Sequence, residues 1–463
     1  LTLDNNGKSS LTAPINDRAG LFMRSVNWAP VVNDLIVTNS SGIGALLWKG
    51  GVMGHDWYIA NNSGNGADFR EFHPAITILR SRDNSGHGVS VRDSSNVELE
   101  FVLTSGNGIG ATSPLLGSGI YFNEANDIMS GGKNVSCFTC ISNSDQHGVI
   151  VRNSIDLQLI SVEIHDPLSG PGLDIDNSGL ARDGHVIMDD LRVDLNSSGY
   201  AVEMTDTNAF ISGLDLSGDN GGVYWKAGDS LTSSIYNSII SGSGGTCFDI
   251  IDHHELIGDN IGLSCGNGSK PSIESSFVNF TDSGFIPSNG SESSFHLIED
   301  SHLRWISSNS ISTPSYSSID NIVDIMWFVD VHAINQISRH IPFAQVNLSF
   351  DAFESSDNYT LPYSGFDTFG PYIGARWLPS QGWSSENQVN VGCDYDGVHN
   401  DSVVAILSND LTVYCRLELT NQPPFIIWDS PEADAEFPSG SAVIFNANES
   451  WDLDDDPLTY SWT

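Results

Sequence analysis

Three carboxylates occupy corresponding places in two neighbouring repeats of the sequence. Asp174 and Asp176 lie in the segment GLDID, which begins at Gly172, and Glu203 ends the segment GYAVE, which begins at Gly199. If these segments are adjacent strands about 4.8 Å apart, their carboxylates form one cluster. Paired carboxylates shift each other's pKa values and can divide into a general acid and a general base. Glycoside hydrolysis uses such a pair.

Basic and aromatic side chains flank the three carboxylates in the same alignment. Arg152 and Lys226 stand on either side of the cluster, and Tyr121 and Tyr224 are predicted to point outward, where their rings could stack against sugars. A polysaccharide lyase would place calcium on the acids and use a basic residue to take the proton. Alternating charges are also typical of an ion-pair ladder along a stable solenoid face. Catalysis and a structural ladder both remain open at these residues.

A repeated five-residue phrase positions these side chains. It consists of Gly, an apolar residue, a variable residue, a second apolar residue and a polar residue, and it recurs at steps of 31, 29, 24, 27, 23 and 23 residues. Its alternation predicts a β-strand with two inward and two outward side chains. Strands that recur at this spacing are typical of a solenoid, in which each repeat packs against its neighbours. The phrases are GVSVR from Gly88, GIYFN from Gly119, GVIVR from Gly148, GLDID from Gly172, GYAVE from Gly199, GVYWK from Gly222 and GTCFD from Gly245.

Second apolar strands follow the phrase in most repeats. Examples are VELEFVL from Val97, LQLISVEI from Leu157 and VIMDDLRV from Val186. Two or more strands per turn and little helical signal predict an all-β protein with a parallel β-helix over residues 1–268. A leucine-rich horseshoe has similar periods, but its stricter leucine spacing is absent.

Residues from about 40 to 268 therefore resemble the right-handed parallel β-helix of the pectate-lyase-like superfamily. The resemblance rests on the repeated phrases and implies the fold more than an activity. That superfamily includes polysaccharide lyases and hydrolases, and also phage spikes, adhesins and surface proteins without catalysis. The Asn-Thr-Asp and Asp-Asp strings typical of its polygalacturonases do not occur at the carboxylate cluster, which places glycosidase chemistry in doubt.

Two regions follow the repeats. Residues 269–325 are rich in Ser and irregular, which predicts a cap or linker. Residues 326–420 alternate apolar and polar residues, as in WFVDVHAI from Trp327, and predict an immunoglobulin-like antiparallel β-sandwich. VDVHAI and the stretch Pro342–Val346 resemble carboxypeptidase-regulatory-like modules. An unrelated sandwich is the alternative.

The last residues, 421–463, resemble part of a PKD-type, immunoglobulin-like module. The resemblance lies in the order FNA–S–D–D–DPLTYSW between Ser441 and Thr463. PKD modules are extracellular spacers or sugar-associated modules, and a complete one needs about twice this length. The resemblance implies that the chain stops within a domain and that the native protein is longer.

An acidic cluster in this last region is a candidate calcium site, because carboxylate oxygens suit that ion. The alternative is a solvated turn in which an Asp caps the next strand. Pro457 stands where the Gly of an EF-hand loop would be. The predicted ligands are Asp452, Asp454 and Asp456, with Asp455 beside them.

Six cysteines form three local pairs in the sequence, and an even number favours disulfides. A C-x-x-C redox site would need a βαβ context, and zinc would need further ligands at the right spacing. We therefore predict structural pairs. They are Cys137 with Cys140, Cys247 with Cys265, and Cys393 with Cys415.

Asn-x-Ser/Thr sequons are present in mild excess over chance, so N-glycosylation is an expectation of the sequence. The sequons begin at Asn39, Asn61, Asn134, Asn196, Asn267, Asn279, Asn289, Asn347, Asn358, Asn400 and Asn448.

Acidic residues outnumber basic ones by 58 to 18, which gives a formal charge of −40. Such a surface repels nucleic acids and anionic membranes and attracts divalent cations and basic partners. No apolar run is long enough for a transmembrane helix. Together with the paired cysteines, this composition predicts an extracellular or cell-surface protein that does not bind nucleic acid.

The sequence supports two functional hypotheses. The first is a modular surface protein with a structural or adhesive role, whose β-helix face binds glycans, cations such as Ca²⁺, or neighbouring subunits, with self-assembly as a further possibility. The alternative is a polysaccharide lyase or glycoside hydrolase acting at Asp174, Asp176 and Glu203. An enzyme would show carboxylates with raised pKa values in a groove, and a scaffold would pair them individually with Arg152 and Lys226.

Overall fold

The protein is all-β, with 62% of residues in strands and no helix in the part of the chain that the computed structural model describes. The described chain divides into two compact units, Leu1–Val323 with Leu378–Gly382, and Asp324–Trp377 with Trp383–Thr463. The structure describes residues 1–463 except 5–18, 27–29, 95–96, 111–116, 126–134, 144, 155–156, 179–185, 195–199, 217–221, 228–231, 244–245, 267–268, 287–293, 309–310, 355, 385, 420–423, 428–429, 432–434, 440, 454–455 and 462–463.

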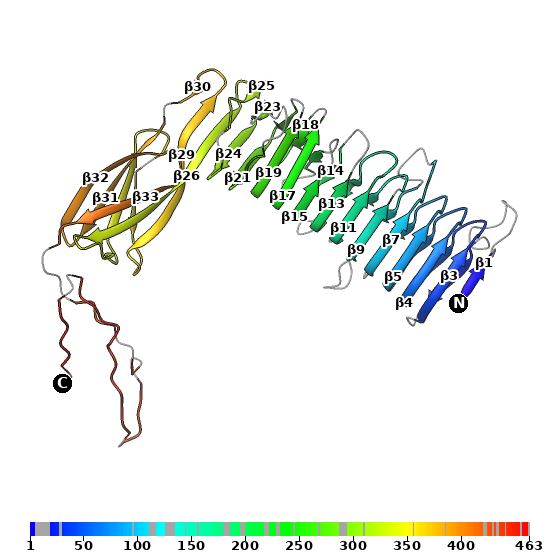
Figure 1. Cartoon of the computed structure of the whole chain (residues 1–463), viewed down its shortest axis with the longest axis horizontal. Coiled ribbons are helices and arrows are strands. Elements are labelled where there is room, and N and C mark those ends of the chain that lie inside the picture. Colours follow the sequence, from blue (N-terminus) through cyan, green and yellow to red (C-terminus); the bar gives the residue numbers. More distant parts are fainter. Residues whose placement is uncertain are drawn as a thin grey trace. The chain divides into compact units, whose positions relative to one another are not determined.

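The first unit is a β-solenoid of about 11 turns whose strands stack in parallel (Figure 1). Each of the seven repeated phrases contributes to a short strand, β20 takes the same place in the coil after them, and a longer strand follows each short one. The short strands are β6 (Val89–Arg92), β8 (Ile120–Asn123), β10 (Val149–Arg152), β12 (Leu173–Ser178), β14 (Val202–Thr207), β16 (Val223–Lys226), β18 (Thr246–Ile251) and β20 (Lys270–Glu274). The longer strands are β7 (Glu98–Ser105), β9 (Val135–Asn143), β11 (Leu157–His165), β13 (Val186–Asp194), β15 (Ala209–Leu216), β17 (Ser233–Ser243), β19 (Leu256–Gly266) and β21 (Phe277–Thr281).

The solenoid begins before the first repeated phrase. Its early coils contain β1 (Thr2–Asp4), β2 (Leu21–Val26) and β3 (Val31–Thr38), followed by β4 (Ala45–Ala60) and β5 (Ala67–Arg82). β4 and β5 are long, parallel and in register from Ala45↔Ala67 to Ala60↔Arg82. The parallel β-helix predicted from the phrases is thus present from the first strands onward.

Parallel coils also continue through residues 269–325, where a cap or linker was predicted. The strands there are β20, β21, β22 (Gly284–Phe285), β23 (His296–Ile298), β24 (His302–Ile306) and β25 (Ser315–Tyr316). β18 pairs with β20, β20 with β23, and β23 with β25, all in parallel. The predicted boundary at residue 268 is therefore wrong as an end of the solenoid. Ser-rich composition misled the prediction because serines serve inside the coils.

Serines close the corner after several short strands, in residues 269–325 as in the earlier coils. Ser276 accepts the backbone N–H of His253 at 2.9 Å and donates to the carbonyl of Glu274 at 2.6 Å. Asn153 and Asn177 adopt left-handed φ angles of 48° and 50° at this corner, a conformation that Asn tolerates better than most residues. Ser178 follows, donates its hydroxyl to the carbonyl of Asp176 at 3.0 Å, and accepts the backbone N–H of Ser154 at 3.1 Å. The hydroxyl thus replaces a ladder hydrogen bond where the chain turns.

A second buried ladder runs inside the early coils. The Nδ2 of Asn62 donates to the Oδ1 of Asn84 at 2.8 Å, and the Nδ2 of Asn84 donates to the Oδ1 of Asn107 at 2.8 Å. Asn107 in turn donates to Asp145 at 2.9 Å. All four side chains are buried, so the ladder satisfies polar groups that burial would otherwise leave without partners.

The second unit contains a sandwich-like module. Strand β27 (Gln345–Phe350) pairs antiparallel with β28 (Asp357–Thr360) and with β31 (Gln388–Tyr395), and β31 pairs with β32 (Val398–Ile406). Facing this sheet, β26 (Ile322–Asn335) pairs with β33 (Leu411–Leu417), but in parallel, which differs from the all-antiparallel sandwich that was predicted. The same region holds β29 (Phe366–Leu378) and β30 (Gly382–Trp383).

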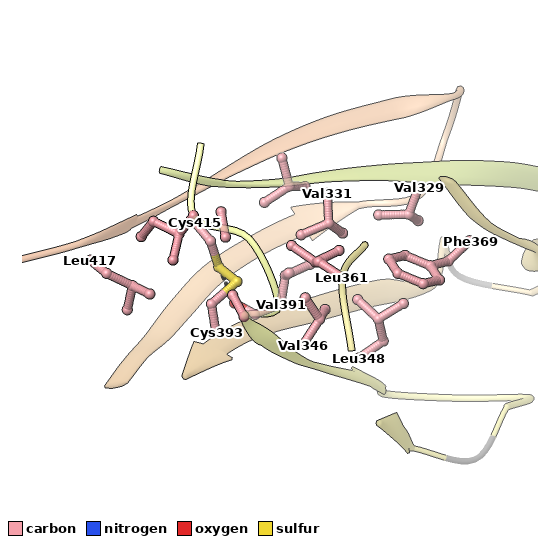
Figure 2. Packing of buried hydrophobic residues seen from close by; sticks show 14 of the residues in the cluster. Val329, Val331, Val346, Leu348, Leu361, Phe369, Val391, Cys393, Cys415 and Leu417 are labelled. Carbon is pink, nitrogen blue, oxygen red and sulfur yellow. Dashed lines mark hydrogen bonds between the residues drawn. A yellow bond between two sulfur atoms is a disulfide. The ribbon is translucent and has the colours of Figure 1, made fainter. Parts of the chain in front are cut away.

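Buried side chains from both layers meet in one core (Figure 2). Val329 and Val331 of β26 pack toward Val346 of β27, and all three are fully or almost fully buried. The Cys393–Cys415 pair joins β31 to β33 within this core, with 6.1 Å between the Cα atoms. The module thus holds its two layers together by apolar burial and by a covalent link.

The end of the chain packs against this module. Isolated antiparallel bridges join Phe425 to Trp451 and Ser430 to Asn446. Leu453 is fully buried in the module's core, and its carbonyl accepts a hydrogen bond from the Nδ2 of Asn335 at 2.5 Å. Residues 421–463 therefore contact the sandwich through specific side chains.

Candidate functional site

The side chains on the face of the short strands opposite the solenoid core form two columns, and Asp68, Ser90 and Ile150 among them are buried. Strand register defines them, because each pair of opposite residues is fixed by the parallel ladder. The first column contains Asp68, Ser90, Tyr121, Ile150, Asp174, Glu203, Tyr224, Asp249 and Ser272. The second contains Arg70, Arg92, Asn123, Arg152, Asp176 and Thr205, with Lys226 and Ile251 in later coils.

Glu203 lies opposite Asp174, whereas the alignment of the phrases placed it beside Asp176. The alignment of the phrases places Tyr200 opposite Leu173. In the structure the register of β14 is shifted by two residues, so Val202 pairs with Leu173. A shift of two residues keeps every side chain on its face, and the alternation in the sequence therefore could not reveal it. Asp249 is shifted in the same way and lies opposite Tyr224.

Arg152 bridges the two aspartates. Its Nη2 donates to Asp174 at 2.5 Å, its Nη1 donates to the backbone carbonyl of Asp174 at 3.1 Å, and its Nε lies 3.9 Å from the carboxylate of Asp176. The side chains of Arg152 and Asp174 are only 14% and 16% exposed. The predicted contact of Arg152 with both aspartates is present, and solvent screens it little.

Lys226 forms its ion pairs with other residues than the three carboxylates. Its ammonium group is 3.8 Å from Asp206 and 3.8 Å from Asp252, two exposed residues at the corners of adjacent coils. The prediction that Lys226 flanks Glu203 as a partner is therefore not what these ion pairs show. The two-residue shift of β14 explains the difference, because it moves Glu203 into the other column.

The surroundings of Glu203 raise the pKa of its carboxyl group. Burial raises the pKa of its carboxyl, the charge of Asp174 raises it further, and Arg152 opposes both effects. Asp174 is its register partner on a strand about 4.8 Å away. A carboxyl with a raised pKa beside an ion-paired carboxylate is an arrangement that can support general acid–base chemistry.

His147 lies close enough to this cluster for the charge of Asp174 to act on its imidazole. It is buried, and burial lowers the pKa of its imidazole below the ordinary value, against the opposing effects of a hydrogen bond with Ser169 and of the charge of Asp174. Its Nδ1 lies 3.5 Å from the hydroxyl of Ser169, and its buried Nε2 has no hydrogen-bond partner. The sequence signal was its place immediately before the Gly of a phrase.

The two predicted stacking residues are half-buried and supported from within the protein. Tyr121 lies face to face with His87, with ring centroids 4.5 Å apart and an interplanar angle of 6°. Tyr224 packs against Tyr200 with ring centroids 5.5 Å apart, and the hydroxyl of Tyr200 donates to Asp249. Each ring is therefore held in place before any ligand arrives.

The predicted disulfides and the metal site have different outcomes. All three cysteine pairs lie at disulfide distance, with Cα–Cα separations of 6.0, 5.5 and 6.1 Å. Of the predicted calcium ligands, Asp454 lies outside the described residues, as does the neighbouring Asp455, and Asp452 is buried and accepts the backbone N–H of Asp456 at 3.2 Å. Within the described ranges, no group of three or more His, Cys, Asp or Glu side chains is arranged to hold a metal ion.

The sequons fall into three groups by exposure. Five of their asparagines are exposed: Asn39, Asn61, Asn347, Asn358 and Asn448. Asn279 and Asn400 are partly buried. Asn134, Asn196, Asn267 and Asn289 lie outside the described residues.

Comparison with known proteins adds no relative. No family model, no curated protein and no solved structure matches the chain. In the described part of the chain, no helix is long and apolar enough to cross a membrane. The functional argument therefore rests on the geometry of the columns.

Proposed function

We propose that this chain is an extracellular, modular surface protein with a structural or adhesive role, and that its solenoid face binds glycans. The observation that carries the proposal is the pairing of Arg152 with Asp174 and Asp176, because a ladder of paired charges is what a long, stable, polar face requires. Tyr121 and Tyr224 belong to the same column and offer rings to a sugar.

The rest of the chain supports this proposal. Three cysteine pairs at disulfide distance suit an oxidising, extracellular setting. We further propose that the solenoid is of the pectate-lyase-like type, that residues 326–420 form a carboxypeptidase-regulatory-like module, and that residues 421–463 belong to a PKD-type module. Neighbouring subunits and Ca²⁺, with Asp452, Asp454 and Asp456 as its ligands, remain proposed partners.

Affinity electrophoresis of the full chain through a panel of neutral and acidic polysaccharides tests the glycan proposal. We expect Tyr224→Ala to abolish most of the retardation, because it removes an outward ring from the first column. Tyr236→Ala is the matched control, since Tyr236 is a partly exposed tyrosine on β17, outside that column. Equal retardation of both variants and the unmodified chain would contradict the proposal.

A second candidate function is cleavage of a polysaccharide, and the raised pKa of Glu203 beside Asp174 favours it. In such a reaction Glu203 would donate a proton to the leaving oxygen, and Asp174 would act as base or nucleophile. The test is the release of reducing ends or of unsaturated products from the same panel. Loss of this activity in Glu203→Gln, with retained polysaccharide binding, would place the enzyme hypothesis first.

A further inference from the structure

Two imidazole rings face each other in the second unit. The Nδ1 of His332, on β26, lies 3.2 Å from the Nε2 of His340, which stands after the turn that follows this strand. The ring centroids are 5.1 Å apart, and both side chains are partly exposed. Two ring nitrogens thus lie side by side on residues that solvent reaches.

The backbone holds the two histidines at this separation. Ile334, two residues after His332, forms an antiparallel bridge with His340. The backbone N–H of Ile341 donates to the carbonyl of Ala333 at 2.8 Å. These contacts close a tight turn whose two sides carry the two rings. The pair is therefore set by local backbone structure as well as by contacts between side chains.

Aromatic rings restrict the two imidazoles further. Phe366 stacks on His332, with ring centroids 5.0 Å apart and an interplanar angle of 12°, and its centroid lies 5.1 Å from that of His340. Tyr414, the register partner of His332 on β33, packs with its centroid 5.0 Å away. Gly365 has a φ of +71°, and a Cβ there would lie only 2.8 Å from the Cβ of His340. Rings held in this way lose little freedom when they bind a ligand.

The separation of the two nitrogens matches that of two ligands on one metal ion. Zinc binds imidazole nitrogen at about 2.0–2.1 Å in tetrahedral geometry, so two such nitrogens lie about 3.3 Å apart. The observed 3.2 Å is close to this value. Without a metal, one of the two nitrogens donates its N–H to the other. Metal binding requires that ring to adopt its other tautomer, with the proton on its far nitrogen.

The electrostatic surroundings suit a cation. Burial lowers the pKa of the His332 imidazole and His340 lowers it further, against the opposing charge of Asp330, so the neutral form that a metal requires is favoured. The formal charge of −40 attracts divalent cations to the chain. Among the described residues no third His, Cys, Asp or Glu side chain completes a metal site, so water takes the remaining positions.

We propose that His332 and His340 bind one transition-metal ion of the class that prefers imidazole nitrogen, which is Zn²⁺, Cu²⁺ or Ni²⁺. His332 supplies its Nδ1 and His340 its Nε2. Calcium takes oxygen ligands instead, so this site is distinct from the calcium site predicted at Asp452. It lies in the second unit and does not depend on the function proposed for the solenoid face.

Isothermal titration calorimetry of the full chain with ZnCl₂ tests the proposal, with excess CaCl₂ present to occupy exposed carboxylates. Zn²⁺ binds the unmodified chain saturably, and either His332→Ala or His340→Ala weakens this binding at least about tenfold, because each removes one of the two protein ligands. His399→Ala is the matched control and leaves binding unchanged. The side chain of His399 is 64% exposed in the same module and pairs with Asp394.

Electron paramagnetic resonance of bound Cu²⁺ reads the ligands directly in the unmodified chain, so it tests the site even where a variant is unstable. We expect coupling to one nitrogen from each imidazole, and to a single imidazole in either variant. Four results would overturn the proposal: no saturable heat with Zn²⁺, unchanged affinity in both His332→Ala and His340→Ala, loss of binding in His399→Ala alone, or Cu²⁺ that couples to no pair of nitrogens.

Discussion

Glu203 is the register partner of Asp174 on adjacent parallel strands, and Asp174 is the carboxylate that Arg152 holds. One member of this pair is therefore ion-paired, while burial and its neighbour's charge raise the pKa of the other. This asymmetry is the main electrostatic feature of the solenoid face. It also makes the role of each residue separable by substitution.

Arg152→Gln is expected to lower the free energy of unfolding by about 2 kcal/mol, because it leaves the mostly buried carboxylate of Asp174 without its charged partner. Urea unfolding followed by circular dichroism measures the change. Lys49→Gln is the matched control, since the side chains of the Lys49–Glu71 pair are 50% and 47% exposed, and it should change stability by less than about 0.5 kcal/mol. Equal effects of the two substitutions would show that the Arg152 pair contributes no more to stability than an exposed ion pair.

The raised pKa of Glu203 predicts a pH dependence of stability. The folded state binds more protons than the unfolded state between the ordinary and the raised pKa, so stability falls as the pH rises through that interval and stays lower above it. Glu203→Gln should remove this loss and be more stable than the unmodified chain at neutral pH. Unfolding free energies measured from pH 4 to 8 test this, and parallel curves for the two proteins would refute it.

The buried asparagine ladder predicts a large cost for one amide. Asn84→Ala removes the acceptor for the backbone N–H and the Nδ2 of Asn62, at 3.1 and 2.8 Å, and leaves both donors buried. We expect a loss of about 3 kcal/mol. Asn177→Gly is the control, because it removes the donor to Asn153, at 2.6 Å in an exposed ladder, and Gly adopts the φ of 50° at this position without strain; it should cost less than about 0.5 kcal/mol. Similar losses from both ladders would contradict a special role for burial.

Removal of the Cys393–Cys415 link should destabilise the second unit by about 3 kcal/mol, because the link closes a loop with a sequence separation of 22. The double variant Cys393→Ala/Cys415→Ala tests this in thermal unfolding. The corresponding variant at Cys247 and Cys265 lies in the first unit and should leave the melting of the second unchanged. Destabilisation of the second unit by the Cys247/Cys265 variant but not by the Cys393/Cys415 variant would contradict this prediction.

Much of the solenoid could be predicted from the sequence, because the five-residue phrase recurs once in each coil and marks one strand of that coil. The register of Glu203 could not, since a two-residue slip leaves the alternation intact. The corner contacts of Lys226 also depend on loop lengths that the phrase does not encode. The ladder of Asn62 and Asn84 could have been predicted from the sequence, because each Asn stands four residues before a Gly, Gly66 or Gly88, that directly precedes a strand.

Incubation of the purified chain with glycans that it retains, followed by measurement of reducing ends and of absorbance from unsaturated products, tests the central claim most directly. A scaffold that binds glycans along its solenoid face predicts binding that Tyr224→Ala weakens and no product from any glycan, with or without calcium. Product formation that disappears in Glu203→Gln, while binding persists, would contradict this account and assign the cluster at Asp174 to catalysis.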